Sequence, residues 1–143
     1  MNKISIVLLT LACLTPSITL AQSLAEKEKY ASEDKQMIAS VENTNKQCKT
    51  NITLKWDWSN FDKNALKERG AAGFCNEAFS AINSICSDSA DGLEAVQKNI
   101  KTVTCAYATP RSITLENGNL TFGMNFDAAN DRDAVYEFLK NNL

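Results

Sequence analysis

The sequence predicts an α+β domain in which helices pack on one face of an antiparallel β-meander. Within the 143 residues, apolar side chains recur at helical spacing over residues 66–86 and then alternate with polar ones over residues 101–126. Four cysteines after residue 21 indicate two disulfides, which supplement the limited hydrophobic core of a small exported domain. The expected order is N-terminal helices, a central amphipathic helix, three strands and a C-terminal helix.

The first 21 residues match a secretory signal peptide. Lys3 forms the positive n-region, residues 4–14 form a mostly apolar h-region, and residues 19–21 offer small side chains before a cleavage point. The apolar stretch is about half of the roughly twenty residues that span a bilayer. We therefore expect residues 22–143 to form a single domain that is periplasmic or secreted.

Residues 10–13 resemble the lipobox of bacterial lipoproteins, in which the cysteine carries the lipid. However, Thr10 stands where these lipoproteins have an apolar residue, and residues 14–21 lead to a second cleavage site. We expect Cys13 to be an ordinary leader residue, so that no stable membrane anchor remains after cleavage.

The mature chain is weakly acidic. Lys3 is the only charged residue before position 22, so the 15 basic and 17 acidic side chains become 14 and 17, a net charge of −3. Nucleic acids and anionic membranes are bound through a clustered basic face, and no run of like charges occurs. We therefore expect no nucleic-acid partner.

The cysteines of the mature chain are Cys48, Cys75, Cys86 and Cys105. Their spacing lacks the close pairs of a structural zinc site and the chain has no histidine, so no metal site is expected. A helix separates Cys75 from Cys86 by about 16 Å, beyond the roughly 7 Å that a disulfide permits. Two pairings remain: Cys48–Cys75 with Cys86–Cys105, or Cys48–Cys86 with Cys75–Cys105. The first closes the shorter loops and is preferred.

Local patterns predict the first elements. A surface helix is expected over about residues 25–46, where apolar side chains are sparse but helically spaced. Residues 51–58 alternate apolar and polar side chains, which is typical of a short edge strand or an extended linker. Ser59 or Asn60 is expected to cap the next helix.

The central helix is the clearest periodic signal. Apolar residues follow the i, i+3, i+4 pattern over residues 66–86. Gly70 and Gly73 weaken its start, so a bend or a restart is expected at residues 69–72. A shorter helix should follow before the chain becomes extended at residue 101.

The Asn-Gly pair at residues 117–118 predicts a tight β-hairpin. A two-residue turn there places Leu115 opposite Leu120 on one face and Thr114 opposite Thr121 on the other. With residues 101–107 this hairpin should complete the meander. A closing helix is expected over about residues 131–141, capped by Asp127 or Asn130.

Trp56 and Trp58 are the first feature with functional character. Tryptophan can stack on sugar rings or bases, and Asp57 between them can accept a hydroxyl group. The simpler interpretation is that both indoles pack the domain. Trp56, Asp57 and Trp58 are therefore the candidate ligand-binding residues.

No catalytic set emerges from the remaining residues. Without histidine, the serine triad, the cysteine–histidine dyad and His-ligated zinc are excluded, and disulfides leave no spare thiol. Phosphate loops and dinucleotide fingerprints are missing, so no cofactor is expected. Carboxylate chemistry is possible, but spacing singles out no pair. The acidic run at residues 127–133 lacks the features of an EF-hand and is interpreted as a helix start.

These observations predict a non-catalytic binding module of the bacterial envelope that acts on a protein partner, such as an inhibitor, an immunity-type protein or an accessory subunit. The alternative is a small envelope hydrolase or ligand-binding protein that uses Trp56, Trp58 and nearby carboxylates. The two hypotheses differ in geometry. A hydrolase needs an exposed tryptophan above a pocket with two facing carboxylates, whereas a partner-binding module does not.

Overall fold

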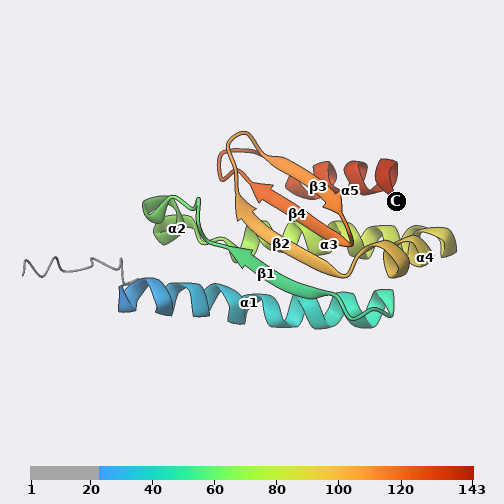
Figure 1. Cartoon of the computed structure of the whole chain (residues 1–143), viewed down its shortest axis with the longest axis horizontal. Helices are drawn as coiled ribbons and strands as arrows, with labels where there is room; N and C mark the ends of the chain where they lie inside the picture. Colours follow the sequence, from blue (N-terminus) through green and yellow to red (C-terminus); the bar gives the residue numbers. More distant parts are fainter. Residues whose placement is uncertain (1–22) are drawn as a thin grey trace, which may run out of the picture.

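The computed structural model describes residues 23–143 (Figure 1). The predicted signal peptide, its cleavage point and Cys13 lie outside the described residues. The elements are, in order, α1 (Leu24–Cys48), β1 (Thr53–Asp57), α2 (Lys63–Arg69), α3 (Ala72–Asp88), α4 (Ala90–Asn99), β2 (Thr102–Tyr107), β3 (Ser112–Glu116), β4 (Asn119–Met124) and α5 (Asp131–Asn142).

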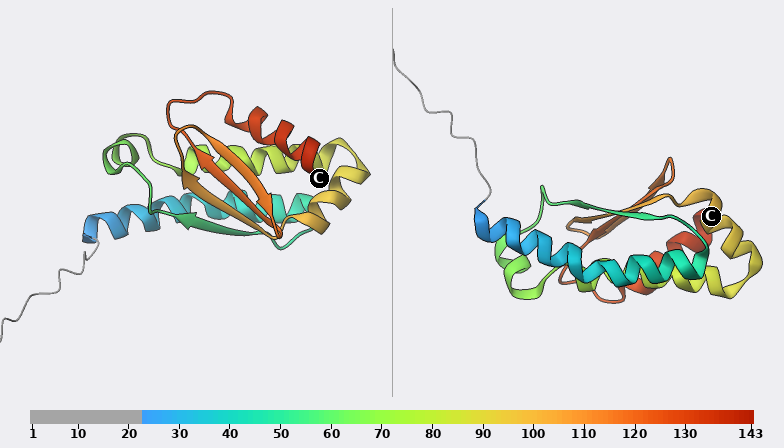
Figure 2. Two further views of the ribbon diagram at one scale, coloured as in Figure 1. Left: turned by 45° about the horizontal axis from the view of Figure 1, so that its top comes forward. Right: turned by 90° about the horizontal axis from the view of Figure 1, so that it is seen from below.

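The described chain forms two layers. Helix α3 is the centre of the helix layer and packs against α1 on one side and α5 on the other. The sheet lies over one face of this layer and its other face is open (Figure 2). The predicted α+β class and the two disulfides are confirmed.

The predicted three-stranded antiparallel meander is wrong. The sheet has four strands in the order β1-β2-β4-β3; β1 and β4 run parallel to β2, and only β3 and β4 are antiparallel. The inward side chains of β4, including Leu120 and Phe122, are fully buried, whereas Ile113 and Leu115 of β3 are half-buried. Because β4 is the more apolar strand, it takes the position between two neighbours and β3 takes the edge. Strand β1 forms the other edge, one of the two alternatives predicted for residues 51–58.

The hairpin prediction is confirmed in its register. Leu115 pairs with Leu120 and Thr114 with Thr121. Asn117 and Gly118 both have positive φ, at 50° and 80°. This turn geometry twists the chain in the same sense as the two strands, which is why an Asn-Gly pair favours it.

The central helix restarts where expected, as α2 and α3. Gly70 between them has a φ of 73°, and α3 has no side-chain cap from its own sequence. Instead, Glu33 of α1 accepts hydrogen bonds from the backbone N–H groups of Ala71 (2.8 Å) and Ala72 (2.6 Å). Helix α2 is capped by Asp62 and not by either of the two residues predicted.

The preferred disulfide pairing is wrong, and the other allowed pairing is present. Cys48–Cys86 joins the ends of α1 and α3, and Cys75–Cys105 joins the start of α3 to β2, with Cα separations of 5.5 and 5.8 Å. Strand β1 carries the chain back along α1 before α3 begins, so α1 and α3 run in the same direction and their C-terminal ends meet (Figure 1). The loop lengths behind the preference change closure entropy by less than about 1 kcal/mol.

Candidate functional site

Helix α1 extends past the edge of the sheet. Three packed helices span about 16–20 Å between outer axes, whereas four strands span about 14 Å, so the helix layer is wider than the sheet that covers it. Figure 1 shows α1 running beside β1, beyond the strand's open edge. We call this step the α1–β1 ledge. Its apolar side chains are Tyr30, Ile38, Val41, Leu54, Trp56 and Trp58, all of them half-buried or exposed.

Three aromatic rings form a stack at one part of the ledge. The ring centroids of Tyr30 and Trp58 lie 4.2 Å apart with nearly parallel planes, and those of Trp58 and Trp56 lie 4.5 Å apart. The buried ring of Phe61 packs against Trp58 at 4.8 Å and links the stack to the core. The indole N–H of Trp56 is buried and has no hydrogen-bond acceptor. The two tryptophans therefore pack against the domain. Their rings and that of Tyr30 are half-buried, so part of the stack is exposed to solvent.

Asp57 is not brought together with the two tryptophans. Side chains alternate along β1, so Asp57 projects from the open face of the sheet while Trp56 projects toward the helices. The hydroxyl and the backbone N–H of Ser59 donate to the Asp57 carboxylate at 2.6 and 3.0 Å. These hydrogen bonds, the one from the hydroxyl being the stronger, lower the pKa of Asp57.

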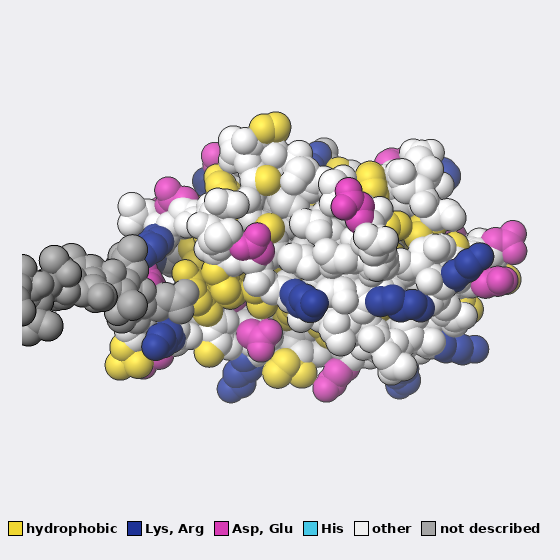
Figure 3. All heavy atoms as spheres, in the orientation of Figure 1, with side chains coloured by type: hydrophobic (Ala, Val, Ile, Leu, Met, Phe, Trp, Pro, Cys, Tyr) yellow, Lys and Arg dark blue, Asp and Glu magenta, His cyan; other side chains and the backbone are white. Residues whose placement is uncertain are grey.

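A small apolar groove of about 280 Å³ lies where α1 passes the start of β1. Met37, Ile38, Val41 and Leu54 line it, and Asp34 and Glu42 stand at its helix side. Ile38 is 51% exposed. It and Leu24 are the two exposed large hydrophobic side chains of residues 23–143, and both belong to α1. Figure 3 shows hydrophobic side chains gathered along α1 and between its first half and the strand above it.

A second groove of about 400 Å³ lies beyond Tyr30, between α1 and α2, and its rim is mostly basic. Lys63 pairs with Glu26 at 2.5 Å, which raises the pKa of Lys63. Lys29 pairs with buried Glu33 at 2.6 Å. The residues that line this groove are Ala25, Glu26, Lys29, Tyr30, Lys63, Asn64, Leu66 and Lys67.

Buried and part-buried contacts attach α1, and with it the ledge, to the rest of the domain. Glu33 is only 1% exposed and binds the start of α3, as described above. Asn45 accepts from the backbone N–H of Ile52 (2.7 Å) and donates to its carbonyl (2.9 Å), which fixes the approach to β1. Together with the Cys48–Cys86 disulfide, these contacts attach α1 to the domain at several points along its length.

Sequence reasoning identified the tryptophans but missed Tyr30 and Ile38 as part of the same surface. Both are among the sparse apolar residues of the helix predicted over residues 25–46. One signal was available, because Met37 and Ile38 are adjacent and neighbouring side chains of a helix point about 100° apart. Met37 is buried, so Ile38 faces away from the core.

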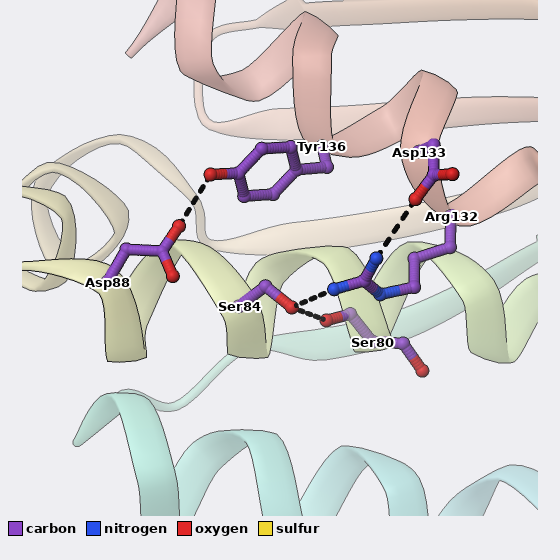
Figure 4. Close-up of polar contacts among 6 residues, drawn as sticks. All are labelled: Ser80, Ser84, Asp88, Arg132, Asp133 and Tyr136. Atoms are coloured by element: carbon purple, nitrogen blue, oxygen red, sulfur yellow. Dashed lines mark hydrogen bonds and ion pairs between the residues drawn. The ribbon is translucent and has the colours of Figure 1, made fainter.

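A polar seam runs between α3 and α5 on the other side of the molecule (Figure 4). Arg132 donates to the Ser84 hydroxyl at 2.8 Å and pairs with Asp133 at 2.9 Å. The Tyr136 hydroxyl donates to Asp88 at 2.6 Å, and this hydrogen bond raises the pKa of Tyr136. All these bonds lie at the surface, so the seam is a solvated contact between two helices.

A third groove, of about 570 Å³, collects acidic side chains at the start of α5. Two of its three carboxylates are paired with arginine: Asp131 with Arg111 at 2.6 Å, and Asp133 with Arg132 at 2.9 Å. No tryptophan lines it. Because two of the three carboxylates are paired with arginine, this groove does not offer the two unpaired carboxyl groups of a glycosidase.

Within residues 23–143, no cluster of potential ligands is placed to hold a metal ion, and none of the helices combines the length and hydropathy of a membrane span. The two disulfides indicate an oxidising, extracytoplasmic environment. No family model, curated protein or solved structure matches this chain.

Proposed function

We propose that this chain is an exported, non-catalytic module, periplasmic or secreted, that binds a protein partner through the α1–β1 ledge. Inhibitors, immunity-type proteins and accessory subunits are modules of this kind, because each acts by binding another protein. The predicted leader and the oxidised cysteines support export. The weakly acidic balance and the scattered charges favour a protein partner over a polyanion.

The proposal depends on one observation: an exposed apolar surface lies directly beside a sheet edge that has no neighbouring strand among the described residues. The exposed side chain of Ile38 and the aromatic stack at Trp58 lie on the ledge beside β1, whose one neighbour among the described strands is β2. Continuous apolar surface rimmed by charge is typical of protein interaction sites. Aromatic side chains are enriched at the centres of such sites.

The hydrolase and ligand-binding alternative finds less support among the described residues. The rings of Trp56 and Trp58 are occupied by each other and by Tyr30, which leaves no free face between them for a sugar. Asp57 lies on the opposite face of its strand. The groove with the most carboxylates lies elsewhere, and arginines neutralise two of them.

The test is capture of a partner by the mature protein from the envelope and medium of the organism that makes it. We expect one protein in stoichiometric amount with the wild type and its loss with Ile38→Glu, because a buried charge without a partner destabilises an interface. Ala39→Glu is the matched control, since Ala39 is an exposed neighbour on another side of the same helix. Equal capture by both variants, or capture of no protein, contradicts the proposal.

A further inference from the structure

We propose that the free edge of β1 binds an extended segment of the partner as a fifth strand, with an acidic side chain of that segment opposite Lys55 on the open face of the sheet and apolar side chains on the ledge. This inference rests on the proposed function and specifies how the partner is recognised. It follows from three observations: the direction of the main-chain groups of β1, the apolar surface of α1 beside the free edge, and the charges around β1 and α1.

The main-chain groups of β1 show which residues face the free edge. The N–H of Thr53 bonds to the carbonyl of Lys101 at 3.1 Å, so Thr53 faces β2. The N–H and carbonyl of Ile52 bond to Asn45 of α1, so Ile52 faces the opposite way. Because backbone groups alternate along a strand, those of Leu54 and Trp56 also face away from β2. No side chain of residues 23–143 bonds to them.

The Asn45 side chain shows which hydrogen-bonding groups the edge of β1 can pair with. It offers one acceptor and one donor to Ile52, which are the two bonds that a neighbouring strand makes with an edge residue. The backbone N–H and carbonyl groups of Leu54 and Trp56 have no such side-chain partner from α1. An added strand would continue there the pairing that Asn45 begins. Proteins use this strand addition to bind extended peptides.

The ledge provides a floor for alternate side chains of the added strand. A strand that pairs with β1 lies about 4.8 Å beyond it, above the part of α1 that projects past the sheet. Its inward side chains then meet the groove of Ile38, Val41 and Leu54. Asp34 and Glu42 stand on this helix side, so acidic residues are disfavoured there and apolar residues are favoured.

The open face beside β1 favours an acidic side chain opposite Lys55. Lys55 projects from this face, is exposed and belongs to none of the ion pairs among the described residues. The neighbouring carboxylate of Asp57 keeps its negative charge beside Ser59, so an acidic residue is favoured opposite Lys55 and disfavoured opposite Asp57. An acidic residue opposite Lys55 therefore gains an attractive cross-strand pair.

The same lysine disfavours a second copy of this chain as the occupant. Two antiparallel β1 strands that pair through Leu54 and Trp56 place Lys55 directly opposite Lys55 of the second copy. Like charges in this position are destabilising, and a lysine on an edge strand commonly prevents self-pairing. Charge complementarity thus selects a different protein segment.

The test uses a synthetic probe, the amidated and acetylated peptide Thr-Val-Glu-Val-Glu-Val-Thr, with the mature disulfide-bonded protein. We expect hydrogen exchange of the Leu54 and Trp56 amides, followed by NMR, to slow on binding, while the Lys55 amide, already paired with β2, changes little. Replacement of both Glu by Lys in the probe should weaken binding about tenfold. N-methylation of the three central residues should abolish it, because the edge bonds are lost.

Variants of the protein make the test specific. Lys55→Glu should reverse the preference between the two peptides, whereas Lys98→Glu, at an exposed site on α4, should leave it unchanged. Equal binding of the acidic, basic and N-methylated peptides, or no slowing of exchange at Leu54 and Trp56, overturns strand addition. If a partner is captured through Ile38 but these results fail, protein binding stands and only the mode of recognition is wrong.

Discussion

The two neighbours of α3 are attached to it in different ways. On the α1 side a disulfide, Cys48–Cys86, and the buried Glu33 carboxylate at the start of α3 add to exposed bonds from Gln47. On the α5 side the polar contacts are exposed, as in the bond from Arg132 to Ser84. Apolar packing holds α5, and its surface polar bonds add little. The difference indicates that the side carrying the ledge has the more fixed geometry, which would lower the entropy lost in the proposed binding of a partner.

The largest expected effect is removal of the covalent link on the α1 side. Cys48→Ala with Cys86→Ala opens a loop of 38 residues, and chain entropy predicts a loss of about 4 kcal/mol in the free energy of unfolding. Urea denaturation monitored by tryptophan fluorescence measures this loss. A loss below about 1 kcal/mol would show that the non-covalent contacts of α1 suffice.

The second effect concerns the buried carboxylate. Glu33→Gln removes the charge that accepts two backbone hydrogen bonds and pairs with Lys29, so a loss of about 3 kcal/mol is expected. Glu28→Gln, at an exposed site on the same helix, is the control and should change stability by less than about 0.5 kcal/mol. Equal losses in the two variants would contradict a special role for Glu33.

The same carboxylate makes stability depend on pH. Burial raises the pKa of Glu33, but the bonds from Lys29, Ala72 and Ala71 outweigh burial and hold the pKa below its ordinary value of 4.5. A carboxyl with a lowered folded-state pKa stabilises the fold above its unfolded-state pKa. This stabilisation should be lost as pH falls from about 4.5 through the folded-state value, and the loss should be smaller in Glu33→Gln. Urea midpoints measured between about pH 7 and pH 3 test this; identical pH profiles of the two proteins would contradict it.

A smaller effect is expected at the approach to β1. Asn45→Ala removes the two bonds to Ile52 and the acceptor for the Thr50 hydroxyl at 2.9 Å, so a loss of about 2 kcal/mol is expected. Exchange of the Ile52 amide should become faster. Asn43→Ala, an exposed neighbour, is the control and should leave that amide unchanged.

The smallest effect is expected on the α5 side. Arg132→Ala removes the bond to Ser84 and the pair with Asp133, both exposed, so the loss should be about 0.5 kcal/mol or less. Lys98→Ala serves as a surface control. A loss above about 1.5 kcal/mol would show that the seam in Figure 4 holds α5 and would remove the contrast between the two sides.

The accuracy of the sequence predictions followed the range of the interactions involved. The hairpin at residues 117–118, the helix restart at Gly70 and the closing helix α5 each depend on side chains a few positions apart, and each was predicted correctly. The candidate site was predicted only in part. Trp56 and Trp58 stood out by type and spacing, but the stacking of Trp58 on Tyr30 joins residues 28 positions apart and has no local signal.

The sequence by itself determined the cysteine framework, the positions of most helices and strands and the alternation that gives β1 an apolar and a polar side. Only the tertiary structure decided the disulfide pairing, the sheet order and the cap that Glu33 provides to α3. The physical reason is that these features depend on the relative orientation of distant elements. Which cysteines meet, and which strand lies at the centre, depends on how elements far apart in the chain are oriented when their apolar faces pack together.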